Sequence, residues 1–313
     1  MAKVAFVFPG QGTQHVGMGN SLLQEFAAAR EVFDRASFVL GIDMRRLCLE
    51  GPQEALDLTV NTQIAVLTFN TAIYSVFKEK IAIAPIVMAG HSLGEYSALY
   101  AANAISFEDV FSAVQARAQY HQDAVPTGEG AMAAIIGLDS DIVESLCAEV
   151  SNSSAKVTVA IHNTAQQIVI SGHTAAIEKG MVAAKQKGAQ TVVRLPISAP
   201  CHCSLLQKAA DMLQEKLEKI EFHDPSVPVI PNCNPDIFYT RENARNLLLK
   251  QIVSPVKWKQ TVEKMATMGV DTIVEIGPKR TLCGLIKRIN KNINLMSVED
   301  NDSLYKTAEM LSA

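Results

Sequence analysis

Short apolar runs alternate with longer amphipathic stretches along the first third of the chain. Val4–Phe8 and Ile86–Ala89 are apolar runs of the length expected for buried strands. Asn20–Val39 carries apolar residues at helical spacing, and Thr62–Lys80 and Leu93–Ala102 are also compatible with helices. Strands that alternate with helices predict a parallel sheet covered by helices, which places the chain in the α/β class.

The middle third has shorter elements in a different order. It predicts strand, helix, two strands, helix and strand, which is the β-α-β-β-α-β order of ferredoxin-like units. These elements are Ala131–Leu138, Ser140–Val150, Lys156–Ile161, Gln167–Ser171, Thr174–Lys187 and Thr191–Leu195. We therefore predict a small domain, residues 126–198, inserted into a larger one made of residues 1–125 and 199–313. The catalytic cleft should lie between the two domains.

Composition excludes several classes of protein. Apolar residues make up 48% of the chain and charged residues 19%, which allows a large core and argues against disorder. The net charge is −4 and no long basic run is present, so we expect no nucleic-acid partner. No stretch approaches the roughly 18 apolar residues of a membrane span. We expect a cytoplasmic monomer with no membrane partner.

The six cysteines are scattered over the whole chain. A small disulfide-bonded secreted domain would show denser spacing, so reduced thiols are the better interpretation. Cys201-His202-Cys203 resembles a metal cluster only superficially, because no second ligand pair at zinc-finger spacing accompanies it. We expect neither a metal nor another tightly bound cofactor.

Gly90-His91-Ser92-Leu93-Gly94 fits the G-x-S-x-G pattern of a nucleophile elbow. It follows an apolar strand and opens a helix, which is the context that such an elbow requires. Small residues flank the serine because the turn is tight, and the start of the helix places N–H groups near its hydroxyl. We interpret Ser92 as a nucleophile; the alternative is a turn serine that caps its helix.

A serine hydroxyl needs a base to take its proton, and the chain has seven histidines. Spacing alone does not select one of them, because the base need only be close in space. His202 follows Pro200 at the start of a helical stretch that leaves the inserted domain, where it could face the cleft. The alternative is a histidine at the surface or at a helix start.

The loop that follows the first strand, residues 9–14, is rich in small residues. The backbone N–H groups of Gln11 and Leu93 could together hold the oxyanion of a tetrahedral intermediate. The longer G-x-G-x-x-G pattern of dinucleotide-binding loops is not fulfilled, because position 15 is His15. We expect no nucleotide-binding site at this loop.

Arg117 borders the apolar stripe of a predicted helix, since Val110, Val114 and Arg117 recur at i, i+4 and i+7. An arginine there needs a carboxylate partner or must extend its charged end to water. One interpretation is an internal ion pair. The other is a bidentate clamp on a substrate carboxylate, which the planar guanidinium suits well.

Taken together, six segments resemble the malonyl-CoA:acyl carrier protein transacylases of bacterial fatty-acid synthesis, relatives of polyketide acyltransferase domains. The resemblance covers residues 3–290 and implies an α/β-hydrolase-like large domain with a ferredoxin-like insertion. The segments are FPGQGTQ (Phe8–Gln14), AGHSLGEYSAL (Ala89–Leu99), Arg117, SAPCH (Ser198–His202), QIVSPVKW (Gln251–Trp258) and EIGP (Glu275–Pro278).

The resemblance also implies a role for each matching residue. Ser92 would be the acylated nucleophile, and His202 its general base and then the acid and base of the second half-reaction. Arg117 would pair with the free carboxylate of the malonyl group. Gln11 and Leu93 would supply the oxyanion-hole N–H groups.

Two more matching positions are Gln251 and Asn163. Gln251 would orient His202 through its backbone carbonyl, in place of the acid of a triad. Asn163 matches a cleft-lining N-S-P-x-Q stretch, with alanine where the family often has proline.

Two positions depart from the family pattern. Cys201 stands where relatives have serine or phenylalanine, a position associated with acyl choice, and this leaves malonyl against methylmalonyl preference open. Lys279 stands where glycine is usual, and we expect a surface-facing turn there.

The expected activity is that of an [acyl-carrier-protein] S-malonyltransferase. By a ping-pong mechanism it would move malonyl from malonyl-CoA to the phosphopantetheine thiol of an acyl carrier protein, for fatty acid biosynthesis. The nearest alternative is a polyketide acyltransferase that works in trans. A thioesterase of the α/β-hydrolase kind would place an Asp or Glu between serine and histidine in chain order. A non-catalytic docking subunit with a vestigial site is the third alternative.

Overall fold

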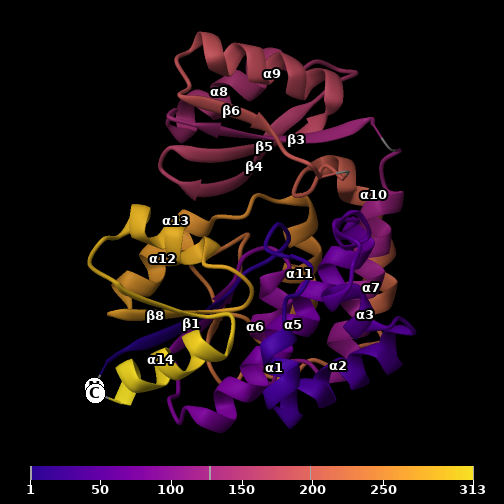
Figure 1. The fold of residues 1–313 in the computed structure, drawn as a ribbon. Helices are drawn as coiled ribbons and strands as arrows, with labels where there is room; N and C mark the ends of the chain where they lie inside the picture. Colours follow the sequence, from indigo (N-terminus) through magenta and orange to yellow (C-terminus); the bar gives the residue numbers. More distant parts are fainter. Residues whose placement is uncertain (1, 127, 198, 313) are drawn as a thin grey trace.

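The computed structural model describes residues 2–126, 128–197 and 199–312 (Figure 1). Thr127, near the start of the predicted insertion, and Ser198 of the SAPCH segment lie outside the described residues. The described chain forms two sheets, one of five strands and one of four. None of its helices combines the length and apolarity that a bilayer crossing requires.

The five-stranded sheet is wholly parallel, with strand order β7-β2-β1-β8-β9. The first strand of the chain, β1, therefore lies at its centre. The strands are β1 (Val4–Phe8), β2 (Val87–Gly90), β7 (Val229–Ile230), β8 (Thr272–Ile276) and β9 (Asn294–Val298). The predicted strand at Val4–Phe8 is confirmed.

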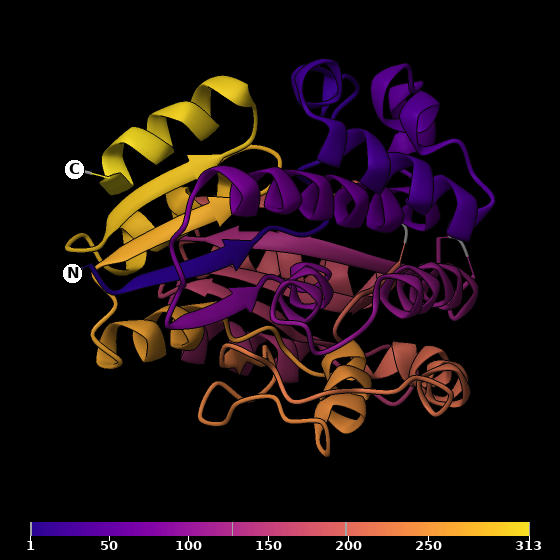
Figure 2. The same ribbon diagram turned by 90° about the horizontal axis from the view of Figure 1, so that it is seen from below.

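The two faces of this sheet bury different cores because side chains alternate along a strand. Phe6 and Phe8 of β1 join the core formed with α2 (Ala27–Leu40), α5 (Thr59–Lys80) and α7 (Phe107–Asp123). Figure 2 shows α5 lying across this face. Ala5 and Val7 face a second core, formed with α12 (Trp258–Thr267) and α13 (Thr281–Ile289). Both faces are therefore covered, as is usual for a parallel sheet.

The helix predicted over Asn20–Val39 is two helices, α1 (Asn20–Glu25) and α2, separated by Phe26. Phe26 has extended φ and ψ angles and a buried side chain. The prediction of one helix was wrong because the apolar spacing continues across the break. The Phe26 side chain packs against a distant part of the chain, and a local pattern does not show such a contact.

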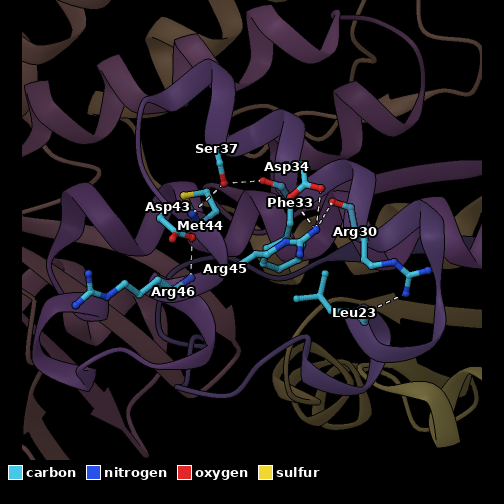
Figure 3. Close-up of polar contacts among 9 residues, drawn as sticks. All are labelled: Leu23, Arg30, Phe33, Asp34, Ser37, Asp43, Met44, Arg45 and Arg46. Carbon is cyan, nitrogen blue, oxygen red and sulfur yellow. Dashed lines mark hydrogen bonds and ion pairs between the residues drawn. The ribbon is translucent and has the colours of Figure 1, made fainter.

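Polar contacts define the end of α2 and the start of α3 (Met44–Leu49), as Figure 3 shows. The Asp43 carboxylate caps α3 by accepting from the N–H of Arg46 at 2.9 Å. The Ser37 hydroxyl accepts from the N–H of Met44 at 3.0 Å. These contacts fix the turn between the two helices.

The four-stranded sheet belongs to the predicted insertion and is antiparallel, with strand order β4-β5-β3-β6. Its helices α8 and α9 cover one face, and the large domain lies on the other side (Figure 1). The elements, in chain order, are β3 (Gly130–Ile136), α8 (Ser140–Val150), β4 (Val157–Thr164), β5 (Gln167–His173), α9 (Thr174–Gln186) and β6 (Thr191–Arg194).

Strand β4 pairs with the segment that precedes α12 through an isolated bridge. The N–H of His162 donates to the carbonyl of Val256 at 2.9 Å, and the N–H of Val256 donates to that of Ala160 at 2.9 Å. This segment leads directly into α12, so the small sheet is attached to the large domain by main-chain bonds. The remaining helices are α4 (Gln53–Leu56), α6 (Gly94–Ala101), η1 (Ser204–Leu206), α10 (Gln207–Leu217), α11 (Ala244–Val253) and α14 (Asn301–Ser312).

Candidate active site

Ser92 lies at a sharp turn between β2 and α6, with a φ of 54°. A side chain on either flanking glycine would collide with the backbone. A Cβ on Gly90 would lie 1.8 Å from the carbonyl carbon of Gly94, and one on Gly94 would lie 2.0 Å from the carbonyl oxygen of Phe8. The turn therefore has the tight, strained geometry of a nucleophile elbow.

His202 contacts the Ser92 hydroxyl. Its Nε2 lies 2.7 Å from Ser92 Oγ, and its Nδ1 lies 2.8 Å from the backbone oxygen of Gln251. A carbonyl oxygen can only accept, so Nδ1 carries a hydrogen and Nε2 is left to accept the hydroxyl proton. Of the seven histidines, His202 is thus the one positioned as a base for Ser92.

The surroundings of His202 keep its imidazole neutral. Burial, together with the positive charge of Arg117, lowers the pKa of His202 to about 3. A base with so low a pKa is unprotonated at neutral pH and ready to accept a proton.

Arg117 lies in the same constellation and is almost fully buried. Its guanidinium donates to the side-chain oxygen of Gln63, to Gln251 Oε1 at 3.1 Å and to Ser92 Oγ at 3.4 Å. No Asp or Glu forms an ion pair with it among the described residues. The internal ion pair, one of the two interpretations of the sequence, is therefore wrong.

A buried cation without a counter-charge costs several kcal/mol. The polar atoms around it are also incompletely satisfied. Arg117 Nε, Gln63 Nε2 and His121 Nε2 are buried and lack a hydrogen-bond partner within the described part of the chain. A carboxylate beside Ser92 would supply both the missing negative charge and acceptor oxygens.

Two backbone N–H groups near Ser92 are free to bind an oxyanion. Neither the N–H of Gln11 nor that of Leu93 has an acceptor among residues 2–126, 128–197 and 199–312. Gln11 follows β1 and Leu93 follows Ser92, and β1 and β2 are parallel neighbours. Both groups therefore lie at the carboxyl edge of the sheet, where α/β proteins bind ligands.

Comparison with known proteins identifies the family. The family model described as acyl transferase domain matches residues 5–303. The chain belongs to this family. A relative from Bacillus subtilis (strain 168), named malonyl CoA-acyl carrier protein transacylase, is 40% identical over 311 residues, 99% of this chain and 98% of the relative. One of the same name from Escherichia coli (strain K12) is 41% identical over 310 residues, 99% of this chain and all of the relative.

Solved structures agree with this assignment. The malonyl CoA-acyl carrier protein transacylase of Coxiella burnetii has a TM-score of 0.97 and 40% identity, covering 100% of this chain and 98% of that one. A malonyl-transacylase in complex with a type II polyketide-synthase acyl carrier protein has a TM-score of 0.96 and 42% identity, covering 99% and 100%.

Three residues of this acyltransferase that sequence reasoning missed hold the elbow in place. Asn232 Oδ1 accepts from the N–H of Ser92 at 2.7 Å, and its Nδ2 donates to the carbonyl of Gly90 at 2.6 Å. The buried carboxyl of Glu95 accepts from the N–H of Asn232 at 2.9 Å and from the Tyr239 hydroxyl. Asn232 and Tyr239 lie in or beside loops far along the chain, and no local signal marks them.

His91 and Asn163 line the cleft together. His91 Nε2 donates to Asn163 Oδ1 at 3.0 Å, and the His91 ring packs edge-on against Trp258 at 5.4 Å. Burial lowers the pKa of His91. His91, which precedes Ser92 in the chain, is thus hydrogen-bonded to Asn163, whereas His202 contacts the serine.

A cavity of about 590 Å³ opens between the two domains and includes Gln11 and His91 in its lining. The large domain contributes the loop after β1 and the start of α13, and the small domain contributes β4, β5 and residues 195–197. The cavity thus lies between the parts of the chain that carry the two sheets.

Replacing Asn232 by alanine should slow acylation of Ser92, because the elbow loses both bonds that the amide makes. We expect at least about a tenfold lower rate of acyl-enzyme formation, since one buried hydrogen bond contributes roughly 1 kcal/mol. Asn234→Ala is the matched control, because the Asn234 side chain has no hydrogen bond among the described residues. A lower unfolding midpoint with an unchanged acylation rate would show that Asn232 is only structural.

Removing the charge of Arg117 should raise the pKa of His202, because a nearby cation disfavours protonation of the imidazole. The rate of Ser92 acylation by acetyl-CoA, measured between about pH 4 and pH 8, should then fall at higher pH in Arg117→Ala than in the unmodified protein. Arg117→Lys keeps the charge and should leave the acid limb where it was. Identical profiles for all three proteins would contradict the electrostatic argument.

Proposed function

We propose that this protein transfers the malonyl group from malonyl-CoA to the phosphopantetheine thiol of an acyl carrier protein. The observation that carries the proposal is the buried guanidinium of Arg117, which lies 3.4 Å from Ser92 Oγ and has no carboxylate partner among the described residues. An acyl group with a free carboxylate would supply that partner while its thioester faces the serine. The names of the relatives in Bacillus subtilis and Escherichia coli support the same activity.

In the first half-reaction, Ser92 Oγ attacks the thioester carbonyl carbon while His202 Nε2 takes the hydroxyl proton. The N–H groups of Gln11 and Leu93 stabilise the oxyanion, and one such donor is worth about 3 kcal/mol. The C–S bond then breaks, and the departing coenzyme A thiolate receives the proton from His202. The product is a malonyl ester on Ser92.

In the second half-reaction the same residues work in reverse. His202 Nε2 takes the proton of the phosphopantetheine thiol, and the sulfur attacks the ester carbonyl of malonyl-Ser92. Collapse of the tetrahedral intermediate breaks the C–O bond, and His202 returns the proton to Ser92 Oγ. No redox step or additional reactant is required, and we propose that no cofactor takes part.

Gln251 connects the parts of this machinery. Its backbone oxygen accepts from His202 Nδ1, its Oε1 accepts from Arg117, and its Nε2 donates to the carbonyl of Ser92 at 2.9 Å. A neutral carbonyl behind the histidine leaves the charge of Arg117 uncompensated. An acid at this place, as a thioesterase would have, would compete with the substrate carboxylate for the guanidinium.

We propose that residues 1–125 and 199–313 form an α/β-hydrolase-like domain and that 126–198 form a ferredoxin-like insertion. The parallel sheet with its elbow after β2 supports the first assignment. The order βαββαβ and the antiparallel strand order β4-β5-β3-β6 support the second. We further propose a monomer that acts in the cytoplasm, in fatty acid biosynthesis. The likeness to a malonyl-transacylase bound to a polyketide-synthase carrier makes polyketide synthesis the second candidate.

Ser92→Ala tests the nucleophile. Mixing the unmodified protein with malonyl-CoA should add the mass of one malonyl group to the intact protein, and the variant should show no increment because it has no hydroxyl to acylate. Intact-protein mass spectrometry gives the result, and adding a holo carrier protein should remove the label by transfer. Labelled Ser92→Ala would refute the assignment, and release of free malonate without transfer would favour a thioesterase.

Arg117→Ala tests the carboxylate clamp. Malonyl transfer should fall by roughly 30-fold or more, because truncating one partner of a buried charge pair costs about 2–5 kcal/mol. Acetyl transfer should be spared or raised, since the acetyl group has no carboxylate to pair. Both rates are measured by transfer from the two acyl-CoAs to the same carrier protein. Equal losses for the two substrates would give Arg117 a structural role instead.

A further inference from the structure

The turn between β8 and α13 holds a lysine in a backbone conformation that favours glycine. Lys279 has a φ of 63°, and its side chain is exposed. A non-glycine residue with left-handed backbone angles costs about 1 kcal/mol. Strain of this kind is commonly retained at functional sites. The exposed Lys279 side chain does not pack in the core, so any favourable interaction that offsets the strain is made by its ammonium group.

The topology brings Lys279 to the same edge of the sheet as the nucleophile. Strands β2, β1 and β8 are parallel neighbours, and they are followed by Ser92, Gln11 and Lys279 respectively. Two strand spacings separate β2 from β8, a lateral distance of about 10 Å. The turn also packs against the Gln11 loop, since a Cβ on Gly277 would lie 2.5 Å from Pro9 Cδ.

Lys279 lines the cavity between the two domains and is the only Lys or Arg among the described residues that do so. It forms no ion pair within the described part of the chain. The one acidic residue in the lining, Asp57, accepts from Gln14 at 2.7 Å and from Gln53 at 2.8 Å. The Lys279 ammonium group is therefore available to an anion in the cavity.

We propose that Lys279 binds the phosphate at the end of the pantetheine arm, which coenzyme A and the holo carrier protein share. This inference rests on the proposed malonyl transfer. A pantetheine arm has about the reach of four extended residues, roughly 14 Å, which spans the lateral distance from the elbow to the β8 turn. The apolar side chains of Leu195, Leu282 and Leu285 in the same cavity suit its dimethyl and methylene groups.

The start of α13 does not offer this phosphate a competing site. The buried carboxyl of Glu275 already accepts from the N–H groups of Leu282 at 3.0 Å and Cys283 at 2.7 Å. Two of the N–H groups that make a helix start attractive to anions are thus occupied. The attraction at this edge comes from the ammonium group of Lys279, which acts as a point charge on phosphate.

The test compares acyl donors with and without the phosphate. Lys279→Ala should raise the KM for malonyl-CoA about 5- to 20-fold, as expected for loss of one partly exposed charged contact, with little change in kcat. The KM for malonyl-pantetheine, which lacks the phosphate, should stay the same. The KM for a holo carrier protein in the second half-reaction should rise as well. Arg280→Ala is the matched control, because Arg280 lines other hollows and not this cavity.

Lys279→Gly separates binding from folding. Glycine adopts the φ of this position freely, so the urea midpoint of unfolding should rise, while the KM for malonyl-CoA should rise as much as in Lys279→Ala. If Lys279 had only a structural role, Lys279→Gly would make the protein more stable without raising the KM.

Three results would overturn the inference. The first is an unchanged KM for malonyl-CoA, and the second is a KM for malonyl-pantetheine that rises as much as that for malonyl-CoA. The third is a KM that rises for the carrier protein alone, which would place the contact on the carrier surface. Each is measured on protein that forms the malonyl-enzyme normally. Failure of the unmodified protein to form a malonyl-enzyme would instead contradict the proposed function.

Discussion

The proposed chemistry depends on one buried positive charge that forms no direct ion pair among the described residues. Arg117 is surrounded by amide and hydroxyl groups, and no carboxylate of the described chain pairs with it. Burying such a charge is unfavourable, so the empty site gains free energy when an anion enters. Because Ser92 Oγ is 3.4 Å from the guanidinium, that gain is realised only by a ligand whose acyl carbon lies near the nucleophile. Under the proposed function, selectivity for a carboxylated acyl group and positioning of the thioester thus have the same cause.

The same charge sets the state of the base. Burial and Arg117 together keep the pKa of His202 near 3, so the imidazole is neutral before substrate binds. A carboxylate bound to Arg117 would offset this effect and favour the imidazolium that forms when Ser92 loses its proton. The backbone carbonyl of Gln251 fits this arrangement, because it fixes the tautomer without adding a negative charge. In the proposed mechanism, binding of the correct substrate and activation of the serine are therefore electrostatically coupled.

The parallel strands and the cavity between the two sheets position these residues. The strands β2, β1 and β8 deliver the nucleophile, the Gln11 loop and Lys279 to one edge of the sheet. Asn232 binds the N–H of Ser92 in the strained elbow, and Glu95 binds the N–H of Asn232. Strands β4 and β5 of the four-stranded sheet contribute the opposite wall of the cavity. In the proposed mechanism, an acyl donor that fills the cavity limits access of water to the acyl-enzyme, which favours transfer over hydrolysis.

Local patterns in the sequence determined the elements whose signals are contained within a few residues. The strand Val4–Phe8, the helix Ser140–Val150 and the strand–turn–helix around Ser92 follow from apolar spacing and flanking glycines. Only the tertiary structure decided which of seven histidines reaches the serine, since 110 residues separate Ser92 from His202. It also decided that Arg117 has no ion-pair partner among the described residues, and that Asn232, 140 residues beyond Ser92, holds the elbow. A chain's periodicity reports which faces are buried, whereas the pairing of polar groups depends on which distant segments the fold brings together.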